Sequence, residues 1–211
     1  MCIRDSAATE VGARIVLLGD APTPQGGEVP VQLVLDSPIA AAAGDRFVLR
    51  DTTAQRTIGG GKFLDLRAPA RKRRTPERLT QLHAYGIGDP ERALAALLDS
   101  PPQFVDLSVF ARDRALNQQQ TQAIVERLGA ITVPAADRVF VLSAPVWLNF
   151  KRGLLATLQG FHADHSDLPG IGLERLRLQL QPLLPTPLFR SILQGLGQKK
   201  EIALDLSLIH I

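Results

Sequence analysis

Cysteine, methionine and aromatic residues are scarce in this chain. Its 211 residues include one Cys and one Met, and aromatic residues make up 5% of it. Cys2 and Met1 both lie in the first hexapeptide, so the rest of the chain can form no disulfide, no cysteine zinc site and no thiol nucleophile. Because no internal Met exists either, we expect the natural start of the protein to lie upstream.

Long apolar runs are also lacking. No stretch approaches the about 20 apolar residues that a membrane-spanning helix needs, and no signal-peptide pattern is present. We therefore expect a soluble, cytoplasmic protein without membrane contacts.

A phosphate loop of the form G-x-x-x-x-G-K-[ST] is absent, because Gly61 and Lys62 are followed by Phe63, which cannot hold magnesium. Gly59-Gly60-Gly61 is interpreted instead as a turn or bend of a β-barrel. The histidines at 83, 162 and 165 lack metal-site spacing, and no pair of carboxylates suggests acid and base roles. We expect no catalysis and no bound cofactor or metal in this chain.

The two ends of the chain are related through their DNA. Codons for the first hexapeptide, residues 1–6, read on the complementary strand as Leu-Ser-Leu-Ile-His-Ile, which is the sequence of residues 206–211. Both ends resemble a transposon-end sequencing adaptor. We therefore expect residues 7–205 to be native and both hexapeptides to be foreign.

Short strands with glycine and proline between them are predicted for the first third of the chain. Strands are expected at residues 14–18, 29–35, 46–50 and 62–64, and no helix is long enough for a parallel crossover. This pattern predicts part of an antiparallel β-barrel over residues 7–68. A barrel that lacks strands exposes unpaired edges, so we expect aggregation or a partly open β region.

A basic segment and then helical periodicity follow. Residues 69–88 are interpreted as a linker that carries Arg71, Lys72, Arg73 and Arg74. From Pro90 the order helix, strand, helix, helix, hairpin predicts a winged helix over 89–145, with Ser108 as a helix N-cap. The order starts again over 146–205, which predicts a second winged helix that ends before its return strand. The fold class is thus mixed, a β-barrel portion followed by α+β winged-helix repeats.

Positive charge leaves nucleic-acid binding open. The net charge is +3, and removing Arg4 with Asp5 leaves it unchanged; the isoelectric point is near 9.4. The basic run could contact RNA phosphates or be a solvated linker. Asn117, Gln118, Gln119, Gln120 and Gln122 begin the presumed recognition helix, where amides could read bases. That helix is poor in cations, which favours a structural or protein-binding role.

Three motifs carry a family resemblance. They are Asp36-Ser37-Pro38, the stretch of residues 44–51 (Gly-Asp-Arg-Phe-Val-Leu-Arg-Asp), and Arg56-Thr57-Ile58-Gly59-Gly60-Gly61. Together they resemble the third domain of the elongation factor Tu class. The basic run and the winged helices, with Pro169-Gly170-Ile171-Gly172, are similar to the selenocysteine-specific elongation factors.

The resemblance implies part of a monomeric factor that delivers selenocysteinyl-tRNA to the ribosome at UGA codons, directed by an mRNA hairpin. GTP and magnesium would serve the parent protein only. The barrel would contribute tRNA contacts, with Arg46, Arg50, Arg56 and Lys62 as candidates; alternation on the strands could instead turn some of them toward Asp45 and Asp51.

Two other classes stay open at the level of sequence. The glutamine-rich helix would suit a winged-helix transcription regulator with an N-terminal β ligand-sensing domain. A protein-binding scaffold would show little salt-dependent RNA affinity.

Overall fold

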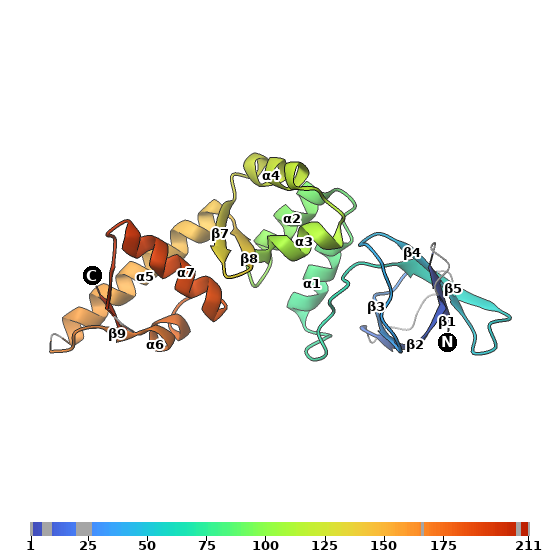
Figure 1. The fold of residues 1–211 in the computed structure, drawn as a ribbon. Helices are drawn as coiled ribbons and strands as arrows, with labels where there is room; N and C mark the ends of the chain where they lie inside the picture. Colours follow the sequence, from blue (N-terminus) through green and yellow to red (C-terminus); the bar gives the residue numbers. More distant parts are fainter. Residues whose placement is uncertain (1, 6–9, 20–26, 166, 206–207, 211) are drawn as a thin grey trace. The chain divides into compact units, whose positions relative to one another are not determined.

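The computed structural model describes residues 2–5, 10–19, 27–165, 167–205 and 208–210. It contains antiparallel sheets and helices in the order drawn in Figure 1. The chain divides into two compact units: residues 1–96 with 111–116, and residues 97–110 with 117–211. Each unit is described by itself below.

A five-stranded antiparallel sheet forms the β-domain of the first unit. Its order is β3-β2-β1-β4-β5. The strands are β1 (Cys2–Asp5), β2 (Glu10–Leu17), β3 (Val31–Leu35), β4 (Arg46–Arg50) and β5 (Thr57–Lys62). Strand β1 lies centrally and pairs with β2 and β4, so residues 2–5, which we predicted to be foreign, fill a position inside the sheet.

Alternation builds the core of this sheet. Phe47 and Leu49 on β4 are buried together with Val11 and Ala13 on β2. The side chains between them point to the other face, as expected for successive residues of a strand. Phe47 also contacts the ring of Phe63, with the centroids 4.9 Å apart.

Helix α1 (Pro76–Tyr85) lies inside the segment that we interpreted as a linker, where no helix was predicted. Thr75 is its N-cap, because the Thr75 side chain accepts a hydrogen bond from the backbone amide of Arg78 at 3.3 Å. Leu82 and Ala84 are buried, and so is Arg78. The basic part of the segment is therefore a short loop before a packed helix.

The first winged helix has the predicted order of elements. They are α2 (Pro90–Asp99), β6 (Val105–Asp106), α3 (Leu107–Asp113), α4 (Gln118–Arg127), β7 (Ile131–Ala135) and β8 (Arg138–Leu142). The predicted stripe of Ala93, Leu94, Leu97 and Leu98 on α2 is buried.

The predicted N-cap of α3 was wrong. The Asp106 carboxylate accepts the hydrogen bond from the amide of Val109 at 3.0 Å. The Ser108 hydroxyl instead accepts from the amide of Val139 on β8, at 3.1 Å. Ser108 therefore attaches the wing to the helix, a contact over 31 residues that local sequence cannot reveal.

The second winged helix repeats the same order. Its elements are α5 (Ala144–Asp164), β9 (Ile171–Gly172), α6 (Leu173–Leu178), α7 (Thr186–Gln198), β10 (Ala203–Asp205) and β11 (Leu208–His210). The sheet orders correspond: β6-β8-β7 in the first module and β9-β11-β10 in the second. Strand β11 holds the return-strand position, although we predicted the second module to stop at residue 205.

One hydrophobic core joins the two modules within the second unit. Its buried residues run from Val133 and Phe140 in the first wing to Phe150 on α5 and Phe189 on α7. The rings of Phe150 and Phe189 meet edge to face, 6.2 Å between centroids. Figure 1 shows α7 beside α5, with β7 next to α7. The wing of the first module is thus packed as part of the second.

Candidate nucleic-acid interface

Two cations lie directly opposite each other on the β4–β5 hairpin. Arg46 and Lys62 are register partners, and both are exposed. Opposed residues of an antiparallel pair share a face and have Cβ atoms about 5 Å apart. Val48 lies on the same face and is 40% exposed. We call Arg46, Val48 and Lys62 the hairpin face; it is a cationic surface with an apolar centre.

Arg50 has a structural role in the same hairpin. Its Nη1 donates to the carbonyl of Ala54 at 2.9 Å, and its Nε is buried without a hydrogen-bond partner. The loop that it braces contains Ala54 at a φ of 56°, a left-handed conformation that is uncommon outside glycine. Arg50 therefore fixes the turn, while Arg56 at its end is exposed.

The carboxylates next to these cations in sequence, Asp45 and Asp51, accept hydrogen bonds from other groups. Asp51 accepts hydrogen bonds from the Thr53 hydroxyl (2.9 Å) and from the backbone amides of Gln55 (3.0 Å) and Arg56 (3.3 Å). The Thr53 hydroxyl, followed by those amides, lowers the pKa of Asp51. Asp45 accepts from the amide of Ala42 at 2.8 Å. Over the residues that the structure describes, no ion pair joins Asp45 or Asp51 to the four candidate cations of the β-domain.

The glycine run forms strand, not a phosphate loop. Gly59, Gly60 and Gly61 are register partners of Leu49, Val48 and Phe47, with a register shift between Leu49 and Arg50. A Cβ on Gly60 would lie 2.7 Å from the carbonyl oxygen of Phe47, and one on Gly61 would lie 2.9 Å from its ring. The glycines thus permit close strand contact, and these residues do not fit GTP.

The described part of the chain offers neither a metal site nor a membrane-spanning helix. No group of His, Cys, Asp and Glu side chains there could hold a metal ion. No helix in those ranges is long and apolar enough to cross a membrane. His165, one of the histidines considered above, follows the last residue of α5 and stacks on Phe161 with the rings 4.7 Å apart.

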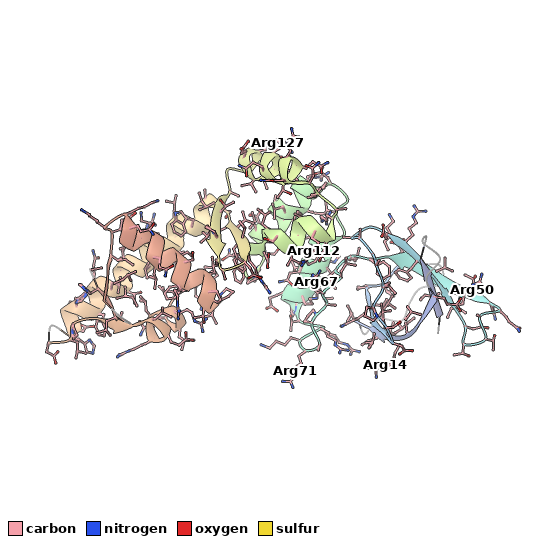
Figure 2. All side chains as sticks on the ribbon, in the orientation of Figure 1. Arg14, Arg50, Arg67, Arg71, Arg112 and Arg127 are labelled. Carbon is pink, nitrogen blue, oxygen red and sulfur yellow. The ribbon has the colours of Figure 1, made fainter. Side chains whose placement is uncertain are left out.

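Four consecutive cations precede α1, and we call Arg71, Lys72, Arg73 and Arg74 the basic loop. Arg71, Lys72 and Arg74 are exposed and Arg73 is half-buried. The Arg73 Nε donates to the carbonyl of Ala70 at 2.9 Å. Figure 2 shows Arg71 on this loop and Arg50 on the hairpin, at separate places on the first unit. The predicted cations therefore form two surfaces, not one.

Sequence reasoning missed the polar contacts that anchor this region. Arg78 and Asp65 form a buried ion pair. Arg67 bonds to the carboxylate of Asp113 at 3.0 Å, and Arg114 donates to the carbonyls of Tyr85 (2.8 Å) and Ile87 (3.1 Å). Desolvation by burial lowers the pKa of Arg114. Only the identity of the charged residues is visible in the sequence, since their partners are up to 46 residues away.

Most amides of the presumed recognition helix are already bonded. Asn117 and Gln120 form a reciprocal capping box at the start of α4, with bonds of 2.8 and 2.9 Å. Gln122 donates to Glu126 at 2.8 Å. Gln118 and Gln119 are exposed. Base reading by the full set of five amides would break the helix cap, so the capping role explains this sequence better.

Models of known protein families match both ends of the chain. Residues 6–70 match the model "Selenocysteine-specific elongation factor, beta-barrel domain", and residues 155–211 match "Elongation factor SelB, winged helix". The selenocysteine-specific elongation factor of Escherichia coli K12 is 31% identical over 206 residues, covering 97% of this chain and 31% of that protein. The Haemophilus influenzae factor is 24% identical, covering 80% of this chain and 26% of that protein.

A solved structure agrees in fold. The crystal structure of a bacterial selenocysteine-specific elongation factor EF-Sec has a TM-score of 0.58 at 16% identity, and the match covers 96% of this chain and 30% of that one. The chain thus spans about a third or less of the length of each of these relatives.

Proposed function

This chain belongs to the selenocysteine-specific elongation factors, with their β-barrel domain followed by winged-helix structure, and from that premise we propose that it is part of a factor that delivers selenocysteinyl-tRNA to the ribosome. Delivery would occur at UGA codons and be directed by an mRNA hairpin. The whole factor would use GTP and magnesium; the glycine run of residues 59–61 forms a strand and not a loop that would hold them.

The observation that carries this proposal is the co-occurrence of two family domains in one chain. The barrel match over 6–70 and the winged-helix match over 155–211 are independent of each other. The alignment to the Escherichia coli factor runs across both. A transcription regulator with a ligand-sensing domain would not carry this barrel, which argues against that alternative.

The hairpin face is the surface that we assign to tRNA in the β-domain. Like charges opposed on neighbouring strands destabilise a sheet, yet Arg46 and Lys62 are register partners. An RNA phosphate placed between them would relieve that repulsion. Arg56 lies exposed in the adjoining turn and would extend the surface, whereas Arg50 would support it from inside.

Extending the gene in both directions tests the proposed function directly. We expect a G-x-x-x-x-G-K-[ST] loop and a further barrel upstream, and additional winged helices downstream. A start codon immediately before Ala7 would overturn the proposal. The extended gene sequence would also decide whether residues 1–6 and 206–211 are foreign, because genomic sequence would then replace both hexapeptides.

A binding experiment tests the tRNA surface. We expect Arg46→Gln with Lys62→Gln to weaken binding of a folded selenocysteine tRNA transcript, measured by fluorescence anisotropy. Arg14→Gln on β2 is the control, since Arg14 is also exposed but lies on another strand. Equal losses of binding free energy per removed charge in the two proteins would show a general effect of net charge and would remove the hairpin face from the proposal.

A further inference from the structure

Three of the four cations of the basic loop form no ion pair within the described part of the chain. In the described part of the chain, no carboxylate lies within ion-pair distance of Arg71, Lys72 or Arg73. Asp65, the nearest buried acid in sequence, is already paired with Arg78. We propose that this loop is a preformed clamp for the phosphate backbone of an RNA helix, an inference that rests on the proposed function.

The loop is anchored at both ends. On its N-terminal side, the Gln32 side chain of β3 donates to the carbonyl of Pro69 at 3.4 Å. On its C-terminal side, Thr75 caps α1, and Arg78 holds that helix to Asp65. The four cations therefore stand between fixed points, although a run of like charges would otherwise repel and extend.

The backbone of the loop is also held in an unusual conformation. Lys72 has a φ of 55°, in the left-handed region that non-glycine residues rarely adopt. The Arg73 Nε bond to the Ala70 carbonyl closes the turn around it. Such conformations persist where the surroundings determine them, often at functional sites. A loop ordered before binding loses less conformational entropy when it binds.

The chemistry of the loop selects phosphate over bases. Residues 67–76 contain no aromatic side chain on which a base could stack. Arg and Lys side chains are donors without an acceptor, so they suit phosphate oxygens. Contacts of this kind fix position without reading sequence. The clamp should therefore hold tRNA and hairpin RNA alike and depend steeply on salt.

A matched pair of double variants tests this clamp in the 211-residue chain. The loop variant is Arg71→Gln with Lys72→Asn, and the control is Lys199→Gln with Lys200→Asn. Lys199 and Lys200 are exposed neighbours, and Lys200 has a φ of 58°. Both variants lose two charges. Both also place Asn, which tolerates the left-handed region, at a residue whose φ is positive.

The readout is the slope of log K against log salt for a folded tRNA transcript and for an mRNA hairpin. We expect the loop variant to flatten this slope by about 1.5 and to weaken binding about tenfold at physiological salt, since each phosphate contact contributes about 0.7 to 0.9 to the slope. The control variant should keep the salt slope and the affinity of the wild-type chain. A loss on only one RNA would assign the clamp to that RNA.

Two results would overturn the inference. One is an equal loss in the control, which would show a net-charge effect only. The other is an unchanged slope in the loop variant while Arg46→Gln with Lys62→Gln weakens binding; the clamp would then fail while the tRNA surface of the proposed function stands. Unchanged circular dichroism of each variant would show that folding is not the cause.

Discussion

Arg78 on α1 and Asp65, three residues after β5, form an ion pair of 2.5 Å whose side chains are 8% and 10% exposed. Removing one partner of a buried pair leaves an unpaired buried charge, which typically costs about 3–5 kcal/mol. We therefore expect Asp65→Ala to lower the free energy of unfolding by about that amount. Asp65→Leu combined with Arg78→Met should recover much of the loss, because the double variant buries no charge.

The control for the ion pair is Arg67→Gln. Arg67 is 52% exposed in its pair with Asp113, and exposed pairs contribute at most about 1 kcal/mol. Urea unfolding can be followed separately in the two units, because the only Tyr is in the first and the only Trp in the second. Suppose that Asp65→Ala lowered the free energy of unfolding, followed by Tyr85 fluorescence, no more than Arg67→Gln does. The buried pair would then not hold the β-domain to α1.

Tyr85 makes the stability of the first unit sensitive to alkaline pH. Burial, and secondarily the charge of Asp65, raises the pKa of the Tyr85 phenol above its ordinary value. The folded state therefore holds this proton more tightly than the unfolded state. This contribution to stability is complete below the unfolded pKa of about 10 and is lost as pH rises through the folded pKa. Tyr85→Phe should remove that part of the pH dependence.

The measurement is urea unfolding by circular dichroism at a series of pH values, in both proteins. Lys side chains ordinarily titrate in the same range, but their contributions cancel in the difference between the wild-type chain and Tyr85→Phe. Parallel stability curves above pH 9, with no divergence, would contradict the raised pKa.

Local pattern predicted much of this fold from the sequence. The strand at 46–50 was placed with its observed bounds, since Phe47 and Leu49 alternate with exposed residues. The helical stripe of α2 and the repeated order of elements followed from periodicity in the same way. The fold class, a β-barrel domain and winged-helix structure, is confirmed.

Contacts between distant residues explain what the sequence could not predict. Helix α1 buries Arg78 against Asp65, 13 residues away, and an Arg in a charged segment suggests solvent exposure. At the candidate site, Arg46 and Arg50 look equivalent on one strand, but only Arg50 bonds into the following turn. The binding roles of Arg46, Arg50, Arg56, Lys62 and the basic loop remain predictions.

Glycines 59 to 61 give a graded test of the hairpin. A Cβ at Gly60 would lie 2.7 Å from a backbone oxygen, whereas one at Gly59 would have its nearest neighbour, the Leu49 side chain, at 3.9 Å. We expect Gly60→Ala to destabilise the β-domain by about 1–3 kcal/mol, as overpacking does. Gly59→Ala should be nearly neutral. Thermal unfolding of both proteins measures this, and equal stabilities would argue against close strand contact.

The shared core predicts that the two winged helices unfold together. Phe140 belongs to the first wing and Phe189 to α7, yet both are buried in one cluster. The Ser191 hydroxyl on α7 also donates to the Pro134 carbonyl on β7. Phe→Ala changes in a core cost about 3–5 kcal/mol. We therefore expect Phe140→Ala, although it lies in the first module, to destabilise the second module about as much as Phe189→Ala does.

Hydrogen exchange of the backbone amides in α5 and α7 would measure this coupling. Protection should fall in both helices for either Phe variant, because opening one part of a common core exposes the rest. Leu148→Ala is the control: Leu148 is 59% exposed on α5, and surface changes usually stay within about 0.5 kcal/mol. If Phe140→Ala left α7 fully protected, the wing would be packed on the second module without sharing its stability, and the modules would open independently.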